Sequence, residues 1–300
     1  MTGIEAAGLG KRYGSRWALR DCNLHIPQGR IVALVGPNGS GKTTLLHLAA
    51  GLTRPTEGAI TIEGAVPGRE RGLVARVGLV AQDVPLYPRF TVGDTLELGR
   101  RLNPVWDDGA RARLRQLEIP EHQRVGDLSG GQRAQVALAL ALGKRPEVLL
   151  LDEPLANLDP LARRAFMQTL LDSATDTGAT VVLSSHLVAD LERTCDYLIL
   201  LASSRVQVSG DIDDLLGCHR VLTGVRSEVA HIEGVASIVE EHHTDRQTTL
   251  LVRTDGAVVD PAWASEAIGL EDLVLAYLGH PASSALPPPR VAVGAAGSSS

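Results

Sequence analysis

Five short runs of apolar residues recur through the first two thirds of the chain. They are IVALV (Ile31–Val35), VGLVA (Val77–Ala81), VLLL (Val148–Leu151), TVVLSS (Thr180–Ser185) and YLILL (Tyr197–Leu201). Their apolarity is continuous rather than alternating, which is typical of strands in a parallel sheet that is covered on both faces. Helical segments separate the runs. The pattern therefore predicts an α/β domain.

Two stretches depart from this alternation. Residues 85–145 have helical patterning without a convincing strand, which predicts a helical insert within an α/β domain of residues 1–219. Residues 220–280 mix short strands and turns and close with a helical run at Leu270–Leu278, which predicts a small α+β appendage. Residues 281–300 are rich in Pro, Ala, Gly and Ser, and we expect a disordered tail.

Composition and charge narrow the class of protein. The 300 residues are 44% hydrophobic and 21% charged, as in an ordinary soluble globular protein. The net charge of −6, without a long basic block, argues against a partner held by phosphate neutralisation, so no nucleic acid is expected. Three widely separated cysteines predict free thiols. The N-terminus carries charges instead of a signal-peptide core, and no apolar run reaches the ~18 residues of a membrane span. Another chain would supply any membrane part.

A phosphate-binding motif follows the first apolar run. GPNGSGKTT at Gly36–Thr44 matches GxxxxGK[ST] between a predicted strand and a predicted helix. Glycines let backbone N–H groups converge on phosphate oxygens, and the helix N-terminus adds partial positive charge. Lys42 can reach the β- and γ-phosphates, and the Thr43 hydroxyl can ligate Mg²⁺. The Lys–Thr pair and the flanking elements favour nucleotide binding over a plain glycine-rich turn. The residues assigned to the nucleotide are Gly36, Pro37, Asn38, Gly39, Ser40, Gly41, Lys42, Thr43 and Thr44.

Two adjacent acids end the apolar strand within EVLLLDEP (Glu147–Pro154). Asp152 is expected at the carboxyl edge of the sheet, where ligands of α/β sheets bind, and is a candidate Mg²⁺ ligand. Glu153 is the candidate general base for the water that attacks the γ-phosphate. Alone, this pair would be a solvated acidic turn. The phosphate motif makes the functional interpretation the better one.

The segment LSGGQRAQVALALALG, which ends at Gly143, begins a helix with two glycines. Gly130 and Gly131 each cost about 1 kcal/mol relative to Ala in a helix. Ser129 and Gln132 fit a capping box, which does not require glycines between its ends. Bare N–H groups at a positive helix terminus suit an approaching anion, so we interpret this start as a second phosphate-binding terminus. Gly143 is the expected C-cap.

Three more polar residues follow predicted strands or loops: Gln82, His186 and Asp159. Gln82 and His186 are ordinary loop residues on their own. Asp159 precedes Pro160, which is typical of an N-cap with proline at the first helical position.

In this order, GPNGSGKT, Gln82, LSGGQ, the strand ending in DEP, LANLD and SSH resemble the ATP-binding-cassette (ABC) ATPases over about Ile4–Val208. The resemblance implies a P-loop NTPase core with a mostly parallel sheet, an antiparallel β N-terminal subdomain and the helical insert, plus the appendage. It implies ATP and Mg²⁺ as cofactors. In this family LSGGQ caps the γ-phosphate held by a second subunit, so two nucleotides lie in a head-to-tail dimer.

The same resemblance assigns further roles. Tyr13 would stack on adenine, and Gln82 would link Mg²⁺ and the attacking water to the helical insert. His186 would contact the γ-phosphate as a switch, and Asp159 would lie at the dimer interface. Asn157 in LANLD replaces the small serine common in the family, which affects the expected details of coupling between the two sites.

The branch of the family follows from softer similarity. One cassette without a membrane span resembles the separate ATPase subunits of bacterial transporters, and segments such as SGDIDDLL and GLEDLVLAYLG are most similar to drug and peptide exporters. This implies a homodimer or heterodimer with a second ABC ATPase subunit, bound to integral membrane subunits on the cytoplasmic face of the cell membrane. An importer subunit is the nearest alternative. ABC ATPases of translation control or DNA maintenance are a further alternative, although the former carry two cassettes and the latter long coiled coils.

Overall fold

The computed structural model describes residues 2–70, 72–188, 191–226, 232–258 and 260–280, with Ser283 and Leu286. The strands in this part of the chain are β1 (Thr2–Tyr13), β2 (Arg16–Pro27), β3 (Ile31–Val35), β4 (Glu57–Ile62), β5 (Val77–Val80), β6 (Val148–Leu151), β7 (Thr180–Ser185), β8 (Tyr197–Ala202), β9 (Arg205–Asp211), β10 (His219–Val225), β11 (Val235–His243), β12 (Gln247–Thr254) and β13 (Trp263–Ala267). The helices are α1 (Lys42–Ala49), α2 (Leu73–Arg76), α3 (Val92–Leu102), α4 (Gly109–Gln116), the 3₁₀ turn η1 (Val125–Asp127), α5 (Gly130–Gly143), α6 (Pro160–Thr177), α7 (Ile212–Gly217) and α8 (Leu270–Gly279).

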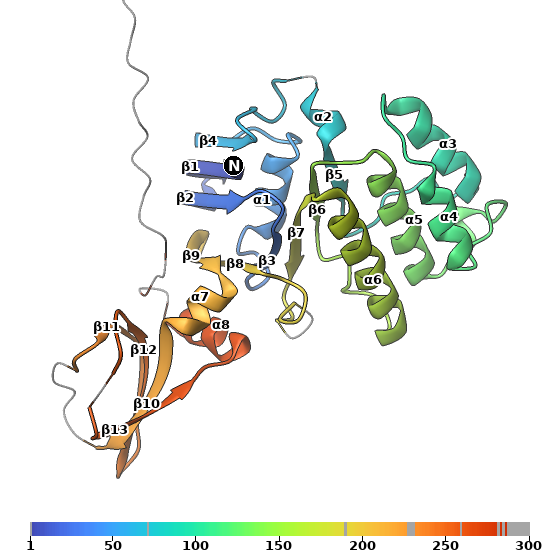
Figure 1. The fold of residues 1–300 in the computed structure, drawn as a ribbon. Coiled ribbons are helices and arrows are strands. Elements are labelled where there is room, and N and C mark those ends of the chain that lie inside the picture. Colours follow the sequence, from blue (N-terminus) through green and yellow to red (C-terminus); the bar gives the residue numbers. More distant parts are fainter. Residues whose placement is uncertain are drawn as a thin grey trace, which may run out of the picture.

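A six-stranded sheet in the order β5-β6-β7-β3-β8-β9 forms the centre of the molecule (Figure 1). The first five strands in that order are parallel, and β9 pairs with β8 in the antiparallel sense. All five predicted strands are confirmed, with boundaries that shift by one residue at most. The sequence analysis did not single out β9.

Alternate residues of the central strands enter two different hydrophobic cores. In β3, Ala33 and Val35 face a core that contains α5 and α6, whereas Val32 and Leu34 face a core that contains α1 and the N-terminal sheet. All four are at most 2% exposed. Burial on both faces leaves no solvent-facing position for a polar residue, which explains the continuous apolar runs.

A separate three-stranded antiparallel sheet, in the order β2-β1-β4, covers α1 at the N-terminal side (Figure 1). The antiparallel N-terminal subdomain implied by the family resemblance is therefore confirmed. The β1–β2 hairpin brings Tyr13 directly opposite Arg16.

The regular elements between β5 and β6 are all helices, and the structure describes this stretch without gaps. Figure 1 shows α3, α4 and α5 beside α6, on the side of the central sheet away from the N-terminal strands. The predicted C-cap at Gly143 is wrong, because α5 continues through Gly143 and its C-cap is Lys144. A Cβ at position 143 would lie 2.7 Å from the Trp106 ring. The glycine therefore gives room to an indole and does not end the helix.

The appendage contains a four-stranded antiparallel sheet, in the order β11-β12-β10-β13, and α8. The sheet begins at His219. Leu270, Leu273 and Val274 of α8 belong to the same hydrophobic core as Leu198 and Leu200 of β8, so the core of the appendage is continuous with that of the central sheet. The expected tail at 281–300 lies almost wholly outside the described residues.

The three cysteines are free, as predicted. Burial raises the pKa of the Cys195 thiol to about 12, and burial also raises the pKa of Cys22 and of Cys218. Because the thiolate is the reactive form, these side chains are poor nucleophiles. In the described residues, no helix combines the length and apolarity needed to pass through a bilayer.

Candidate functional site

The phosphate loop is pressed between two strands, and this explains its glycines. A Cβ at Gly36 would lie 2.2 Å from the Leu201 carbonyl oxygen of β8. Gly41 has φ 112° and leaves only 2.5 Å between an added Cβ and the Ala18 carbonyl oxygen of β2. Helix α1 begins directly after Gly41, which offers no capping side chain. The first N–H groups of α1 therefore have no partner within the helix and point toward a ligand position.

Lys42 and Glu153 meet at the end of this loop. The Lys42 ammonium donates a hydrogen bond to the Gly36 carbonyl at 2.7 Å and lies 3.2 Å from Oε1 of Glu153. Both side chains are less than a tenth exposed. The loop thus holds a buried cation beside the predicted general base.

Glu153 has an uncommon backbone for a residue with a side chain, with φ 47°. Its second carboxylate oxygen, Oε2, lies 2.8 Å from Nδ1 of His186, which follows β7. Oε1 accepts no hydrogen bond within the described residues, although Lys42 is near. A carboxylate with one oxygen held and the other available for a proton can act as a general base.

A cleft of about 590 Å³ opens beside the phosphate loop. The predicted residues that line it are Tyr13, Asn38, Gly39, Gly41, Lys42, Thr43, Thr44, Gln82 and Glu153. Gly36, Pro37 and Ser40 belong to the same loop without lining the cleft. Asp152 is buried directly before Glu153, and His186 contacts Glu153 from outside the cleft. The structure thus brings the residues predicted to bind the nucleotide together with the two predicted acids.

Tyr13 lies at the open end of this cleft and is 53% exposed. The Lys11 ammonium lies 5.2 Å from the centre of the Tyr13 ring and donates a hydrogen bond to the Arg54 carbonyl at 2.7 Å. This cation–π contact supports the ring at one face. With about half of its surface exposed, Tyr13 remains accessible to a ligand in the cleft.

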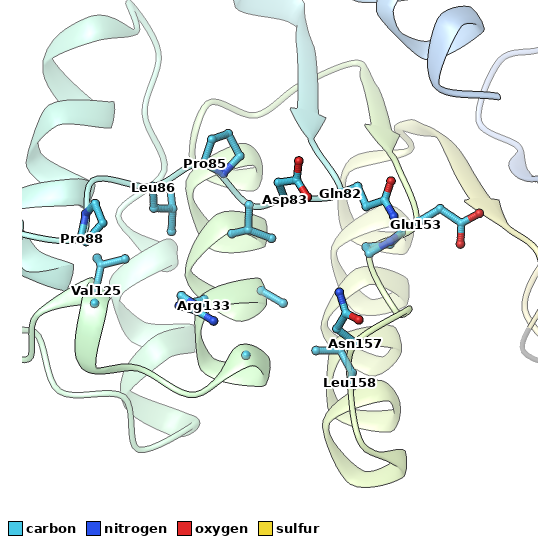
Figure 2. Close-up of a pocket in the computed structure, with 15 residues that line it drawn as sticks. Gln82, Asp83, Pro85, Leu86, Pro88, Val125, Arg133, Glu153, Asn157 and Leu158 are labelled. Atoms are coloured by element: carbon cyan, nitrogen blue, oxygen red, sulfur yellow. The ribbon is translucent and has the colours of Figure 1, made fainter. Parts of the chain in front are cut away.

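Helix α5 opens onto a second cleft, of about 410 Å³, between the helical insert and the central sheet. Figure 2 shows Gln82 beside Glu153, with Arg133 on α5 and Asn157 on the loop that leads from Glu153 to α6. Gln82 and Glu153 line both clefts. The two clefts therefore share a wall.

In the described part of the chain, the residues of the LSGGQ segment do not line the phosphate-loop cleft. Gly130 lines the second cleft, whereas Ser129, Gly131, Gln132 and Asp159 line neither cleft in the described part of the molecule. The capping box is confirmed: the Ser129 hydroxyl accepts from the Gln132 N–H at 3.2 Å, and the Gln132 side chain accepts from the Ser129 N–H at 3.0 Å. The Asp159 N-cap is confirmed as well, since its carboxylate accepts from Leu161 and Ala162.

The two glycines of LSGGQ differ in their surroundings. A Cβ at Gly131 would lie 2.9 Å from the Ala162 Cβ of α6, whereas a Cβ at Gly130 would make an ordinary contact at 3.7 Å with the Asn157 carbonyl oxygen. Close packing of α5 on α6 therefore requires glycine at 131 within one chain. Only Gly130 is left without a packing reason.

Sequence reasoning missed two residues of this region. Arg16 lines the nucleotide-sized cleft from its place opposite Tyr13, and Ser184 is hydrogen-bonded to both Asp152 and Glu153. The sequence offered one signal for Arg16: a two-residue turn after Tyr13 would place Arg16 opposite Tyr13 in a hairpin. Ser184 belongs to the SSH segment of the family pattern, but its hydrogen bonds to the two acids depend on the register of two strands, which the sequence does not show.

Comparison with known proteins agrees with this geometry. A family model described as ABC transporter matches residues 19–156. The Nod factor export ATP-binding protein I of Rhizobium johnstonii is 35% identical over 226 residues, covering 72% of each chain. The protein of the same name from Burkholderia orbicola is 36% identical over 226 residues, covering 72% of this chain and 74% of its own.

Solved structures are similar as well. An ATP-binding subunit of an ABC transporter superposes with a TM-score of 0.65 at 28% identity, covering 71% of this chain and 91% of that one. The dimeric structure of a bacterial ABC transporter cassette has a TM-score of 0.63 at 28% identity, covering 70% and 98%. A bacterial Atm1-family ABC exporter with ATP bound has a TM-score of 0.64 at 27% identity, covering 72% of this chain and 40% of that one.

The fold and the site thus define a P-loop ATPase. More narrowly, the chain belongs to the ABC transporter family, as an ATP-binding subunit.

Proposed function

We propose that this chain powers a membrane exporter by closing as a dimer on ATP and hydrolysing it, while separate membrane subunits carry the transported substrate. The observation that carries this proposal is the convergence of Lys42 and His186 on the two carboxylate oxygens of Glu153, beside the phosphate-loop cleft. Export, rather than import, is supported by the relatives named for Nod factor export and by the structural likeness to an ABC exporter.

In this mechanism the cleft holds the nucleotide along its length. Tyr13 stacks on the adenine with the face away from Lys11, and the loop from Gly36 to Thr44 surrounds the phosphates with backbone N–H groups. Lys42 exchanges its contact with Glu153 for β- and γ-phosphate oxygens. That exchange leaves Oε1 of Glu153 facing the position of the attacking water.

The donor set of the site fits Mg²⁺. Thr43, Gln82 and Asp152 offer hydroxyl, amide and carboxylate oxygens, and hard oxygen ligands are those that Mg²⁺ prefers. Thr43 and Gln82 line one cleft, and Asp152 precedes Glu153 at its edge. When bound, the ion would neutralise charge that develops on the phosphate oxygens.

Hydrolysis then depends on Glu153. Its carboxylate accepts a proton from the water as the water oxygen bonds to the γ-phosphorus, and the bond from that phosphorus to the bridging oxygen breaks. His186 holds Oε2 during this step. In the closed dimer His186 would also contact the γ-phosphate. Gln82 lines both clefts, so it reports the state of the nucleotide to the helical insert.

The second half of each nucleotide site comes from another ABC ATPase subunit. Ser129, Gly130, Gly131 and Gln132 of one subunit would cap the γ-phosphate of the other, with Asp159 at the interface. That these residues lie away from the phosphate loop of their own chain supports this arrangement. We assign the cassette to residues 1–219, with the insert at 85–145, and the appendage to 220–280. The assembly would lie at the inner face of the cell membrane through its membrane subunits.

The test is the substitution Glu153→Gln, with Glu147→Gln as the matched control at the other end of the same strand segment. We expect Glu153→Gln to bind ATP, to lose nearly all turnover and to accumulate an ATP-dependent dimer, because the amide keeps the shape but cannot accept the proton. Glu147→Gln should hydrolyse ATP at the parental rate. Parental turnover in Glu153→Gln would overturn the role given to Glu153, and a parent chain without ATPase activity would overturn the function.

A further inference from the structure

Ser184 joins the two acids of the site through one hydroxyl group. Its Oγ accepts a hydrogen bond from the Glu153 backbone N–H at 2.8 Å and donates one to Oδ1 of Asp152, also at 2.8 Å. The residue is 0% exposed, and Asp152 is 2% exposed. Both hydrogen bonds therefore lie out of reach of water, where each is stronger and costly to lose.

The register of the central sheet places this hydroxyl. Strands β6 and β7 are parallel, with Leu151 opposite Leu183. Asp152 follows Leu151 in the chain, and Ser184 follows Leu183. At this point β6 ends and β7 continues, so Ser184 lies beside a turn that carries the two acids.

The backbone of Glu153 needs such a partner. Its φ of 47° lies in the left-handed region, which carries an energetic cost for a residue with a side chain. The hydrogen bond from the Glu153 N–H to Ser184 offsets that cost and fixes the direction in which the side chain leaves the backbone. His186, two residues after Ser184, holds Oε2 of the same side chain. The end of β7 therefore fixes Glu153 at its backbone and at its carboxylate.

From this geometry we propose that Ser184 is a positioning residue for hydrolysis: it sets the orientation of Glu153 as the base and of Asp152 beside it. The inference rests on the proposed function and deepens it. Ser184 acts through the geometry of the base and leaves the phosphate-loop contacts of the nucleotide unchanged. It therefore predicts a loss in kcat without a matching rise in KM.

Ser209 provides the control for a buried serine without this role. It is 3% exposed in β9, and its hydroxyl is 3.2 Å from the Tyr197 hydroxyl at the other edge of the sheet. Ser184→Ala and Ser209→Ala each remove one buried hydroxyl. A purely structural role would give them similar effects on stability and on turnover.

The experiment measures steady-state ATP hydrolysis by the full chain with its membrane subunits, for the parent, Ser184→Ala, Ser184→Thr and Ser209→Ala. Loss of a supporting hydrogen bond behind a reacting group typically costs about 10- to 100-fold in activity. We expect that loss in kcat for Ser184→Ala, with KM for ATP near the parental value. Ser184→Thr keeps the hydroxyl and should recover most of the loss, and Ser209→Ala should keep the parental kcat.

A second readout does not depend on turnover. Hydrogen–deuterium exchange of the Glu153 amide should be faster in Ser184→Ala than in the parent and unchanged in Ser209→Ala. Where the alanine variant fails to fold, Ser184→Cys keeps the volume with a weak donor and should show the same direction in both measurements.

The outcomes separate this inference from the function. Parental kcat and parental exchange in Ser184→Ala, with Glu153→Gln inactive, would overturn only the role of Ser184. Equal losses of kcat in Ser184→Ala and Ser209→Ala would assign the effect to stability and also overturn it. A parent without ATPase activity would overturn the proposed function, and the exchange measurement would still report on the Ser184 contact.

Discussion

Nζ of Lys42 lies 3.2 Å from Oε1 of Glu153, and the two residues come from elements that are far apart in the chain, the first turn of α1 and the end of β6. Each side chain is less than a tenth exposed. Removing one member of a buried ion pair leaves the other as an uncompensated charge. The contact is therefore a property of the folded state that can be measured without any nucleotide.

The first prediction concerns this pair. Lys42→Met should lower the free energy of unfolding more than the combined variant Lys42→Met with Glu153→Gln, because the second change removes the buried charge that the first leaves behind. A coupling of about 0.5–3 kcal/mol is expected for residues in contact. Urea denaturation of the parent, both single variants and the double variant measures it. Additive effects within error would show that the two side chains are independent.

The second prediction separates the glycines of LSGGQ. Gly131→Ala should be less stable than Gly130→Ala by about 1–3 kcal/mol, because only the former pushes a Cβ to within 2.9 Å of Ala162. Both changes gain about the same helix propensity, which cancels in the comparison. Ala162→Gly should restore part of the loss in the Gly131→Ala background.

Activity should not follow stability at position 130. Gly130→Ala has room within its own chain, so it should fold at least as well as the parent and yet hydrolyse ATP more slowly, since its new methyl group lies where the partner's nucleotide would approach. Thermal unfolding and ATPase assays on the same samples check this. Parental ATPase activity in Gly130→Ala would show that position 130 has no role in closure.

Local sequence patterns are sufficient for the strands of the central sheet and for the helix caps. Continuous apolar runs predicted the five parallel strands, because burial on both faces is visible in the residue types themselves. Caps such as Ser129 and Asp159 were predictable as well, since a cap depends on neighbours within three residues. Ser184 was not predictable, because its partners are joined to it only by the register of β6 and β7.

Glycines were harder to interpret than polar motifs. Gly143 was predicted to be the C-cap of α5, but it is the last helical residue, and the Trp106 ring leaves no room for a Cβ there. Gly131 was interpreted as part of an anion site, and the structure gives it a packing reason in Ala162. In both positions the determinant is a side chain from elsewhere in the chain, which no local pattern reveals.

The third prediction concerns Tyr13. Tyr13→Ala should weaken ATP binding by about 1–3 kcal/mol, the usual contribution of one base stacked on an aromatic ring, while Tyr13→Trp should keep the parental affinity. Tyr87→Ala is the control, since Tyr87 is also an exposed aromatic residue but does not line the cleft. Calorimetric titration with ATP measures the dissociation constants. Equal affinity for ATP in Tyr13→Ala and Tyr87→Ala would show that adenine does not stack on the Tyr13 ring.

The last prediction concerns pH and the junction between α7, β10 and α8. His219 is 0% exposed; its Nδ1 lies 2.6 Å from the Leu215 carbonyl oxygen and its Nε2 lies 2.8 Å from the Tyr277 hydroxyl. Because the carbonyl can only accept, Nδ1 carries the proton and neutral Nε2 accepts from Tyr277. Burial lowers the pKa of His219 below its ordinary value of 6.5, and the nearby Arg253 charge lowers it as well.

A lowered pKa in the folded state means that the unfolded chain binds the proton first as the pH falls. The contribution of His219 to stability is therefore fully present above pH 6.5 and is lost as the pH falls below that value toward the folded-state pKa. His219→Gln cannot titrate in this range. The difference in unfolding free energy between the parent and His219→Gln should therefore change below pH 6.5, at a slope of at most about 1.4 kcal/mol per pH unit, and stay constant above it. Denaturant titrations from about pH 8 to about pH 5 measure this difference, in which the other histidines cancel. Parallel curves over the whole range would show that His219 titrates alike in the folded and unfolded chain, and that its burial does not favour the neutral ring.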